Sequence, residues 1–257
     1  MHRPSMSARV LNNASTASQR SNRSATFARS RVASKPGRPK AITVQAQAES
    51  WEVDQGGVVF GVDDIAKATG GTVALRGDNT LGSISTDSRL IRSGQWLLAL
   101  KGENFDCHDL LPSLVDEDIA GAIGSRPPPK SWTKAYVQVP DTLAALQALA
   151  RSVREQFAGT GPVVAITGSC GKTTTRAMVE LVLGTLGPIH ATTGNFNNHI
   201  GLPLTLLKLP AASAACVLEL GMSHLGEIAE LAGICHPTVR VVTNVAAAHT
   251  EGVGGIE

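Results

Sequence analysis

The stretch VVAITGSCGKTTT, Val163 to Thr175, constrains the fold of this chain more than any other segment. Its first five residues form a continuous apolar run, which is typical of a strand buried in a parallel sheet. A loop rich in Gly and Ser follows, and a helix is expected from about Lys172 to Leu186. A strand, a glycine-rich turn and a helix in this order indicate a phosphate-binding α/β domain, because backbone N–H groups at a helix N-terminus bind anions.

The loop departs from the usual phosphate-binding pattern G-x-x-x-x-G-K-[ST]. Its end is regular, but Ile166 stands where the first glycine is expected, and a glycine comes two residues later. We expect backbone N–H groups from Gly168 to Lys172 to bind phosphate oxygens, Lys172 to neutralise the β and γ phosphates, and the Thr173 hydroxyl to hold Mg²⁺. The alternative is a structural turn that happens to end in Lys-Thr. The predicted ATP-binding residues are Gly168, Ser169, Cys170, Gly171, Lys172, Thr173 and Thr174.

The rest of the second half alternates between strand and helix patterns. AACVLEL (214–220) and VRVVTNV (239–245) are apolar runs of strand length, and GEIAELAGI (226–234) between them has a helical pattern. Strand, helix, strand, helix, strand predicts an open parallel sheet with right-handed crossovers.

The first half is a smaller module with short, mixed elements. VDDIAKATGG (62–71) predicts a two-turn helix that ends at its two glycines. TVAL, SIST, WLLAL and AGAIG predict short strands, and a proline-rich break follows at 125–132. Apolar residues at helical spacing, Leu143, Leu146, Ala150, Val153 and Phe157, then predict a helix with Asp141 as its N-cap.

These patterns predict an α/β chain with two folded parts. A small mixed α/β N-terminal module is followed by an incomplete, P-loop-type, parallel-sheet ATP-binding domain. The expected boundaries are 58–140 for the first domain, 141–159 for a connecting helix and 160–257 for the second domain.

The charge of the chain is unevenly distributed. Nine of the 23 basic residues and none of the 21 acidic residues fall within residues 1–48, so the remainder carries 14 basic and 21 acidic groups. A net-acidic folded part argues against a nucleic-acid binder, and no apolar run is long enough to cross a membrane. The Arg- and Ser-rich, acid-free leader is typical of a transit peptide, which predicts import into the plastid (chloroplast stroma), with the mitochondrion as the alternative. A disordered basic tail is the other interpretation.

Several sequence blocks resemble the Mur ligase superfamily, the ATP-dependent amide-forming enzymes of peptidoglycan synthesis. Besides the phosphate loop, they are TTGNFNNHIGLPLTLL (192–207), LELGMSHLGEIAEL (218–231), TNVAAAHTEGVGG (243–255) and, upstream, STDSRLIRSGQWLLALKGENFDCHD (85–109). The blocks are most similar to those of the family member that adds D-alanyl-D-alanine to UDP-N-acetylmuramoyl-tripeptide. A diaminopimelate-adding or cyanophycin-type ligase, and a non-catalytic nucleotide-binding remnant, are the alternatives.

The resemblance implies roles for residues of the second half. Lys172 matches a catalytic phosphate-binding lysine, Thr173 and Glu219 match Mg²⁺-binding residues, and His249 matches a histidine that helps to bind a second Mg²⁺. Asparagines in such a loop usually satisfy turns, but here they match a block that faces nucleotide and muramoyl substrate. They are Asn195, Asn197 and Asn198.

In the first module, the resemblance implies contacts with the UDP-sugar. Arg89 could pair with a phosphate, although a salt bridge within the turn is an equal alternative. Cys107 stands where the family usually has a glycine, so it carries a backbone penalty of roughly 1 kcal/mol if its φ is positive. The predicted substrate-binding residues of this module are Ser85, Asp87, Ser88, Arg89, Asp106 and His108.

The implied reaction uses ATP and Mg²⁺ as cofactors. ATP phosphorylates the peptide carboxylate, and the amine of D-alanyl-D-alanine then attacks the acyl phosphate. Family members continue beyond the His249 block with a carbamylated lysine and a further domain. We therefore expect this chain to be a monomeric fragment with an unpaired sheet edge that binds nucleotide weakly and does not ligate.

Overall fold

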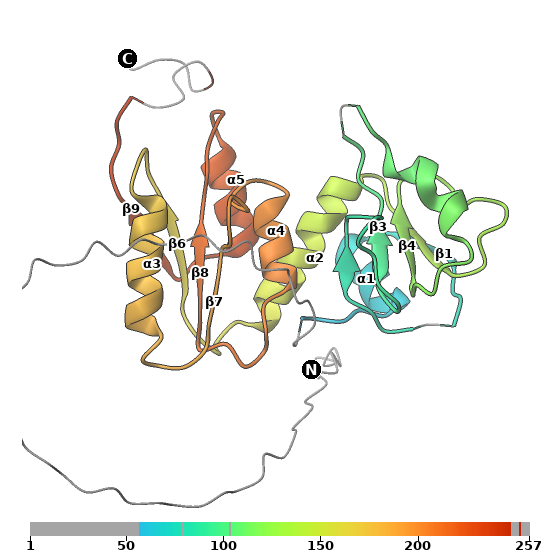
Figure 1. The fold of residues 1–257 in the computed structure, drawn as a ribbon, viewed down its shortest axis with the longest axis horizontal. Helices are drawn as coiled ribbons and strands as arrows, with labels where there is room; N and C mark the ends of the chain where they lie inside the picture. Colours follow the sequence, from blue (N-terminus) through green and yellow to red (C-terminus); the bar gives the residue numbers. More distant parts are fainter. Residues whose placement is uncertain (1–56, 79, 103, 248–251, 253–257) are drawn as a thin grey trace, which may run out of the picture. The chain divides into compact units, whose positions relative to one another are not determined.

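The computed structural model describes residues 57–78, 80–102, 104–247 and 252. The predicted transit peptide at 1–48 and the predicted metal ligand His249 lie outside these residues. Within the described ranges, no helix has the length and apolar character needed to cross a bilayer. The described chain forms two sheets, and helix α2 (Thr142–Gln156) connects them in the sequence (Figure 1).

The first sheet has five strands in the order β1-β5-β4-β3-β2, with β1 antiparallel to β5 and every other pair parallel. Helix α1 (Val62–Thr69) packs with α2 on one face, against Trp96, Leu98 and Ile123. The short helix η1 (Cys107–Leu114) covers the other face, because side chains alternate along each strand. The strands are β1 (Thr72–Leu75), β2 (Ile84–Ser85), β3 (Trp96–Leu98), β4 (Gly121–Gly124) and β5 (Ala135–Gln138).

The termini of α1 and α2 follow from their sequences. The Asp141 carboxylate accepts a hydrogen bond from the Ala144 N–H at 2.9 Å, which confirms Asp141 as the N-cap of α2. Gly70 ends α1 with a φ of 69°, the left-handed conformation that glycine adopts without penalty. Leu146, Leu149 and Ala150 of α2 are fully buried, and the helix contacts α1, α4 (Gly201–Leu207) and α5 (Glu227–Cys235).

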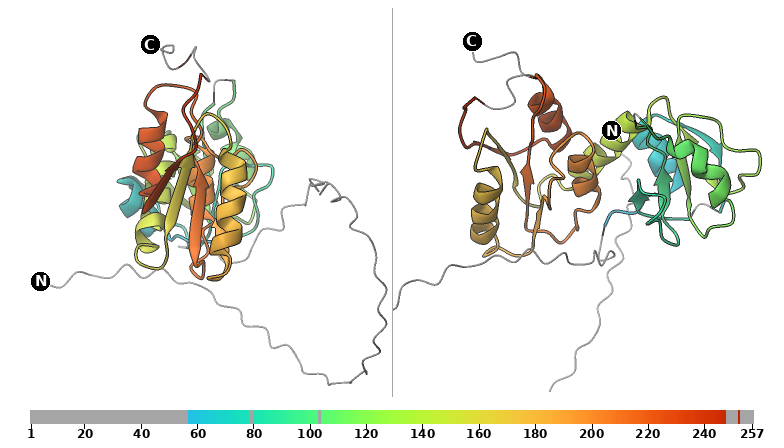
Figure 2. Two further views of the ribbon diagram at one scale, coloured as in Figure 1. Left: turned by 90° about the vertical axis from the view of Figure 1, so that its left-hand side faces the viewer. Right: turned by 45° about the horizontal axis from the view of Figure 1, so that its top comes forward.

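The second sheet is parallel throughout, in the order β7-β8-β6-β9, which confirms the predicted parallel architecture. Its strands are β6 (Val163–Thr167), β7 (Ile189–Ala191), β8 (Ala215–Glu219) and β9 (Val239–Val242). Helix α3 (Lys172–Leu183) packs on one face over Val164, Ile166 and Val217. Helices α2, α4 and α5 pack on the other face, and the left view of Figure 2 shows the strands between these two layers. The carboxyl ends of β6 and β8 therefore lie together beside the start of α3.

The structure confirms the predicted strands but adds elements that the sequence patterns did not reveal. These are β5, β7, η1 and α4, each short and placed by pairing or packing with distant segments. Helix α3 ends at Leu183 instead of the expected Leu186, because Gly184 interrupts it and Gly187 has a φ of 145°. Among described residues, β7 and β9 are the edge strands of the second sheet.

Candidate functional site

The loop between β6 and α3 is held by the segment that follows β9. The Ser169 N–H donates to the Asn244 carbonyl at 3.1 Å, and the Cys170 N–H donates to the Asn244 Oδ1 at 3.0 Å. The Ser169 hydroxyl also bonds with the backbone of Ala246 at 2.9 Å. These contacts correct the expectation that the amides of residues 168–172 all face phosphate, because those of Ser169 and Cys170 already have protein acceptors.

The unused donors lie at the first turn of α3. The first backbone bond into the helix runs from the Thr175 N–H to the Gly171 carbonyl at 2.9 Å. In the described part of the chain, no atom accepts a hydrogen bond from the N–H groups of residues 171–174. Four such donors at the positive end of a helix dipole form an anion-binding site. These four residues are the last four of the predicted ATP-binding set, Gly168 to Thr174.

Lys172 lies over the same loop. Its Nζ donates to the Gly168 carbonyl at 2.6 Å, so its charge is held within the turn that joins β6 to α3. A lysine in this position can neutralise phosphate oxygens bound at the helix N-terminus. The predicted phosphate role for Lys172 is compatible with this geometry.

Thr173 and Glu219 meet at the start of α3. Glu219 is the last residue of β8 and is 2% exposed, and its Oε2 accepts a hydrogen bond from the Thr173 hydroxyl at 3.1 Å. Residues 46 positions apart are thus brought together because the carboxyl ends of β6 and β8 are adjacent.

The donor set suits Mg²⁺. Magnesium prefers oxygen ligands and is usually held by one or two carboxylates together with waters and substrate phosphates. The Thr173 hydroxyl and the Glu219 carboxylate supply such oxygens, and Glu219 Oε2 is the carboxylate oxygen that lies beside Thr173. No cluster of three or more His, Cys, Asp or Glu side chains that could hold a metal ion occurs in the described ranges.

Arg176 belongs to this site, although the sequence analysis did not select it. Its Nε lies 2.8 Å from Glu219 Oε1, and its Nη1 lies 2.8 Å from Glu180 Oε1. Burial raises the pKa of Glu180, the charge of Arg176 opposes this rise, and the charge of Glu219 adds to it. The available signal was the spacing of Lys172, Arg176 and Glu180, which are four residues apart and therefore share one face of the predicted helix.

Thr192 is a second residue that the sequence analysis missed. It follows β7 and is fully buried; its hydroxyl accepts the Glu219 N–H at 3.0 Å, and its carbonyl accepts a hydrogen bond from Arg176 Nη1. One threonine thus connects the end of β8 to helix α3. A single Thr after a short strand gives no sequence signal for such a role.

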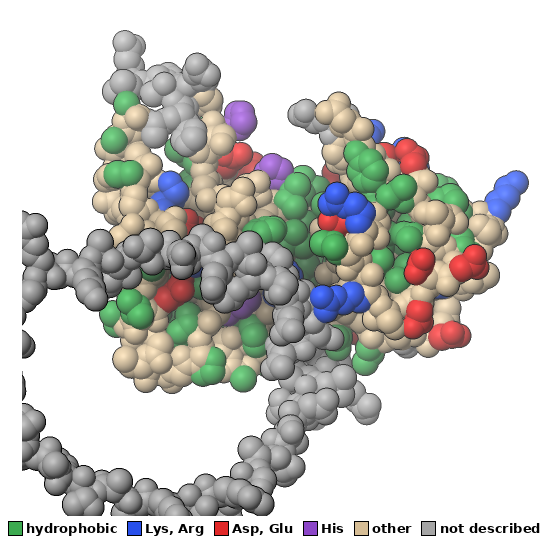
Figure 3. All heavy atoms as spheres, in the orientation of Figure 1, with side chains coloured by type: hydrophobic (Ala, Val, Ile, Leu, Met, Phe, Trp, Pro, Cys, Tyr) green, Lys and Arg blue, Asp and Glu red, His purple; other side chains and the backbone are tan. Residues whose placement is uncertain are grey.

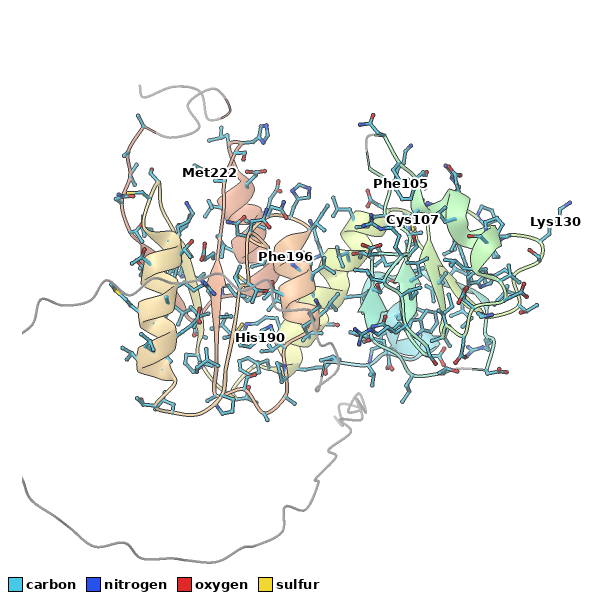
Figure 4. The ribbon with its side chains drawn as sticks, in the orientation of Figure 1. Phe105, Cys107, Lys130, His190, Phe196 and Met222 are labelled. Carbon is cyan, nitrogen blue, oxygen red and sulfur yellow. The ribbon has the colours of Figure 1, made fainter. Side chains whose placement is uncertain are left out.

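The side chain of Asn198 and the backbone carbonyls of Asn195 and Asn197 form hydrogen bonds within the protein. The Asn198 Oδ1 accepts the N–H groups of Ile200 at 3.2 Å and Gly201 at 2.8 Å, so its side chain caps α4. The Asn197 carbonyl accepts the Gly221 N–H at 2.8 Å, and the Asn195 carbonyl accepts the Asn197 N–H at 2.8 Å. The exposed side chain of Phe196, labelled in Figure 4, lies in the same loop.

In the first module, Asp87 and Arg89 pair with each other. Arg89 contacts the two carboxylate oxygens of Asp87 at 2.9 and 2.7 Å, and this pairing lowers the pKa of Asp87. The structure therefore shows the turn salt bridge, which was the alternative to a phosphate contact. Ser85 bonds the backbone of Asp87 within the same turn at 3.3 and 3.4 Å.

The two predicted UDP-sugar blocks lie beside each other. The Ser88 hydroxyl interacts with the Cys107 thiol. Cys107 is buried between the first sheet and η1, and this burial raises the pKa of its thiol. Cys107 and the exposed Phe105 are labelled in Figure 4. Among described residues, His236 alone has a positive φ without being glycine, so Cys107 carries no left-handed backbone penalty.

His108 is fully engaged inside the protein. Its Nε2 accepts the Ser125 N–H at 2.8 Å, so its proton is on Nδ1, which donates to Asp106 Oδ1 at 2.5 Å. Burial would raise the pKa of Asp106, but hydrogen bonds from His108 and the charge of Arg126, 2.6 Å away, hold it below the usual value. Neither ring nitrogen of His108 is left for a substrate, so the predicted sugar contact is corrected to a structural bond between η1 and the end of β4.

The Ser125 hydroxyl lies 3.3 Å from His108 Nε2, which completes a Ser-His-Asp sequence of contacts. Hydrolytic triads need a free Nε2 lone pair to take the serine proton. The Ser125 backbone N–H already occupies that lone pair. This cluster is therefore not a nucleophilic site.

Comparisons with known proteins found a matching domain and similar sequences. Residues 166–257 match the Mur ligase middle domain. The chain is 40% identical over 199 residues to the UDP-N-acetylmuramoyl-tripeptide–D-alanyl-D-alanine ligase of Bacillus subtilis (strain 168), covering 76% of this chain and 43% of that one. It is 41% identical over 183 residues to the ligase of the same name from Escherichia coli (strain K12), covering 70% and 39%. The chain thus spans less than half the length of these relatives.

Solved structures show the same relationship. The crystal structure of MurF from Acinetobacter baumannii matches with a TM-score of 0.71 and 36% identity, over 78% of this chain and 44% of that one. The MurF ligase of Thermotoga maritima in complex with ADP matches with a TM-score of 0.60 and 32% identity, over 66% and 39%. The mixed α/β architecture with largely parallel sheets is shared with these proteins.

Proposed function

Because the chain belongs to the Mur ligase family over residues 166–257, we propose that it acts in the ATP-dependent addition of D-alanyl-D-alanine to UDP-N-acetylmuramoyl-tripeptide. The names of the relatives, at about 40% identity, support this acceptor and substrate. The observation that carries the proposal is the meeting of Thr173 and Glu219 at 3.1 Å, beside four helix N-terminal N–H groups with no acceptor in the described chain. The likeness to a MurF ligase in complex with ADP supports the nucleotide.

In this proposal, the second sheet binds the nucleotide. The N–H groups of residues 171–174 and the Lys172 ammonium bind the terminal phosphates, and Thr173 and Glu219 hold Mg²⁺. A bound Mg²⁺ would offset the negative charge that accumulates between phosphate and carboxylate. The protein contributes fixed dipoles and charges, which need no reorganisation as charge develops.

The reaction proceeds by two displacements. A carboxylate oxygen of the tripeptide attacks the γ-phosphorus, the bond to the β–γ bridging oxygen breaks, and ADP leaves. The D-alanyl-D-alanine amine then attacks the acyl carbon, and the tetrahedral intermediate releases inorganic phosphate and a proton. No covalent enzyme nucleophile is required, so the engaged His108 cluster has no part in this chemistry.

We expect the chain to bind ADP in the presence of Mg²⁺, and Lys172→Met to weaken that binding roughly 10- to 100-fold, since a hydrogen bond to a charged group contributes about 1.5–3 kcal/mol. Isothermal titration calorimetry measures both affinities, and circular dichroism checks that the variant is folded. A folded wild-type chain that binds no ADP would contradict the proposal.

The acceptor is tested separately, on a polypeptide completed to the length of the relatives, of which this chain spans less than half. Phosphate release by that longer protein from Mg-ATP and UDP-N-acetylmuramoyl-tripeptide should require D-alanyl-D-alanine. Equal release with diaminopimelate in place of the dipeptide would exclude the proposed acceptor while leaving the nucleotide site intact.

A further inference from the structure

The Glu219 carboxylate is a buried charge whose two oxygens face different partners. Oε2 faces the Thr173 hydroxyl at 3.1 Å, and Oε1 faces Arg176 Nε at 2.8 Å. Its side chain is 3% exposed, so water solvates it poorly. Burying a carboxylate without a compensating charge costs several kcal/mol. Within the described part of the chain, the basic residue that pairs with Glu219 is Arg176.

The guanidinium group of Arg176 is itself fixed. Nη1 contacts the Thr192 carbonyl and, at 2.8 Å, Glu180 Oε1, and the Arg176 side chain is 17% exposed. The Nε–Oε1 contact is an ion pair whose N–H does not point straight at the oxygen. The arginine is therefore positioned by Thr192 and Glu180, and Glu219 is positioned against the arginine.

This arrangement sets the orientation of the Glu219 carboxylate. The terminal torsion of glutamate has a broad energy profile, so an unrestrained carboxylate takes many orientations. The Thr192 hydroxyl fixes the backbone of Glu219 through its N–H, and Arg176 fixes Oε1. Oε2 is then turned toward Thr173, the other oxygen donor of the magnesium site.

We propose that Arg176 is a positioning residue that keeps the Glu219 carboxylate turned toward Thr173, and so sets the affinity of the site for the magnesium ion of a bound nucleotide. The inference rests on the proposed function, since it concerns the same nucleotide site. It assigns Arg176 no contact with the reacting atoms.

Arg176 could also have the opposite effect on the Mg²⁺ affinity of the site. A fixed cation beside a metal site repels Mg²⁺, so Arg176 could weaken metal binding. The two effects have opposite signs: loss of Arg176 raises the Mg²⁺ requirement if positioning dominates and lowers it if repulsion dominates. The burial of Glu219 favours positioning, because a buried carboxylate that loses the Arg176 contact has little water to replace it and can turn away from Thr173.

The experiment measures ADP binding by calorimetry at increasing Mg²⁺ concentration for the wild type, Arg176→Gln and Arg176→Lys, with ADP binding in EDTA as a reference. The Mg²⁺ requirement is the Mg²⁺ concentration at which the enhancement of ADP binding is half-maximal. Arg176→Gln should raise this requirement about tenfold or more, since losing a group that orients a metal ligand commonly costs 10- to 100-fold in metal affinity. Its ADP affinity in EDTA should match the wild type. Arg176→Lys should recover part of the loss, because it restores the charge but not the planar fork.

Arg151→Gln, on helix α2, controls for the removal of one positive charge and should leave the Mg²⁺ requirement unchanged. A Mg²⁺ requirement for Arg176→Gln within twofold of the wild type, or below it, would overturn the inference. If Arg176→Gln does not fold, Arg176→Lys decides, and a requirement equal to the wild type then overturns it. A folded wild type that binds no ADP at any Mg²⁺ concentration contradicts the proposed function instead, so the two failures are distinguishable.

Discussion

Gly168 is subject to two independent constraints that exclude a side chain. Its φ is 136°, and a Cβ there would lie 2.1 Å from Thr243 Oγ1 and 3.0 Å from the Asn244 nitrogen. The Thr243 hydroxyl donates to the Cys170 carbonyl at 2.6 Å. The glycine that lies two positions from its usual place therefore allows the segment after β9 to pack directly on the phosphate loop. That packing explains why Asn244 holds two of the loop amides.

His236 carries backbone strain at the C-terminus of α5. Its φ of 38° and ψ of 63° are left-handed, a conformation that costs residues other than glycine about 1–2 kcal/mol. It is also exposed and precedes Pro237, which disfavours helical backbone at the preceding residue. We expect His236→Gly to raise the free energy of unfolding by about 0.5–1 kcal/mol, as measured by urea denaturation. This net gain is the strain that is removed minus the larger conformational entropy that glycine loses on folding.

His236→Ala is the matched control, because it removes the imidazole but keeps the Cβ that causes the strain. It should give no gain in the free energy of unfolding. Equal stabilisation by Gly and Ala would attribute the effect to the imidazole, and the strain argument would fail.

At the scale of elements, buried Arg154 joins two helices. It lies on α2, and its Nε donates to the Cys235 carbonyl at 2.8 Å while its Nη2 donates to the His236 carbonyl at 2.8 Å. These carbonyls end α5, where a helix has unpaired acceptors and the negative end of its dipole. A buried cation is therefore satisfied by a helix terminus instead of by a carboxylate. This contact fixes α5 against α2 on one face of the second sheet.

We expect Arg154→Met to lower the free energy of unfolding by about 2–3 kcal/mol, because it removes charge-assisted hydrogen bonds and leaves buried carbonyls unpaired. Urea denaturation measures the change. Arg151→Met, a half-buried arginine on the same helix, should shift the midpoint by less than about 0.5 kcal/mol. Similar losses for both variants would show that α2 is sensitive to any such change and not to the α5 contact.

At the scale of the whole molecule, the two faces of the second sheet are unequally covered. One face packs against three helices in a large core, while the other has a core of three buried residues beneath α3. Figure 3 shows hydrophobic side chains on the surface where α3 lies. Among described residues, the exposed hydrophobic side chains of α3 and the segment after it are Met178, Leu181, Val182 and Leu186. The packing energy of this domain therefore comes mainly from the face formed by α2, α4 and α5.

The stability of the molecule should depend on pH through His190. This residue of β7, labelled in Figure 4, donates from Nε2 to the Thr205 carbonyl of α4 at 2.7 Å. Burial lowers the pKa of His190, and the charge of Lys208 adds to this effect while the hydrogen bond opposes it. The unfolded chain therefore binds a proton at higher pH than the folded chain, so stability is full above about pH 6.5 and falls as the pH drops below it.

His190→Gln keeps a donor for Thr205 but does not titrate, so it should flatten the decline in unfolding free energy between about pH 6.5 and 5. Urea midpoints at several pH values measure the slope. His199→Gln, at an exposed position, should retain the wild-type slope. An unchanged slope in His190→Gln would mean that other groups cause the decline. Asp87 and Asp106, whose pKa values are lowered, lose their contributions only at more acidic pH.

Local patterns predicted much of the fold because they are properties of neighbouring residues. The apolar run of β6, the helical spacing of α2 and the Asp141 cap are each encoded within a few positions, and the structure confirms them. Strands β5 and β7 escaped prediction because three or four residues carry little periodicity, and pairing with distant strands places them. Lys172 and Thr173 were selected from the phosphate-loop pattern and Glu219 through family resemblance, and the structure brings Thr173 and Glu219 into contact.

The order of strands and helices, the glycine-rich loop and the residue types that can bind a nucleotide are encoded in the amino-acid sequence. Which of these groups are available to a ligand depends on the three-dimensional fold. It assigned the amides of Ser169 and Cys170 to Asn244, both ring nitrogens of His108 to the protein, and Arg176 to Glu219. The physical reason is that hydrogen bonds and ion pairs depend on distance in space, and parallel pairing of β6 with β8 and β9 brings together side chains that lie 46 to 77 positions apart.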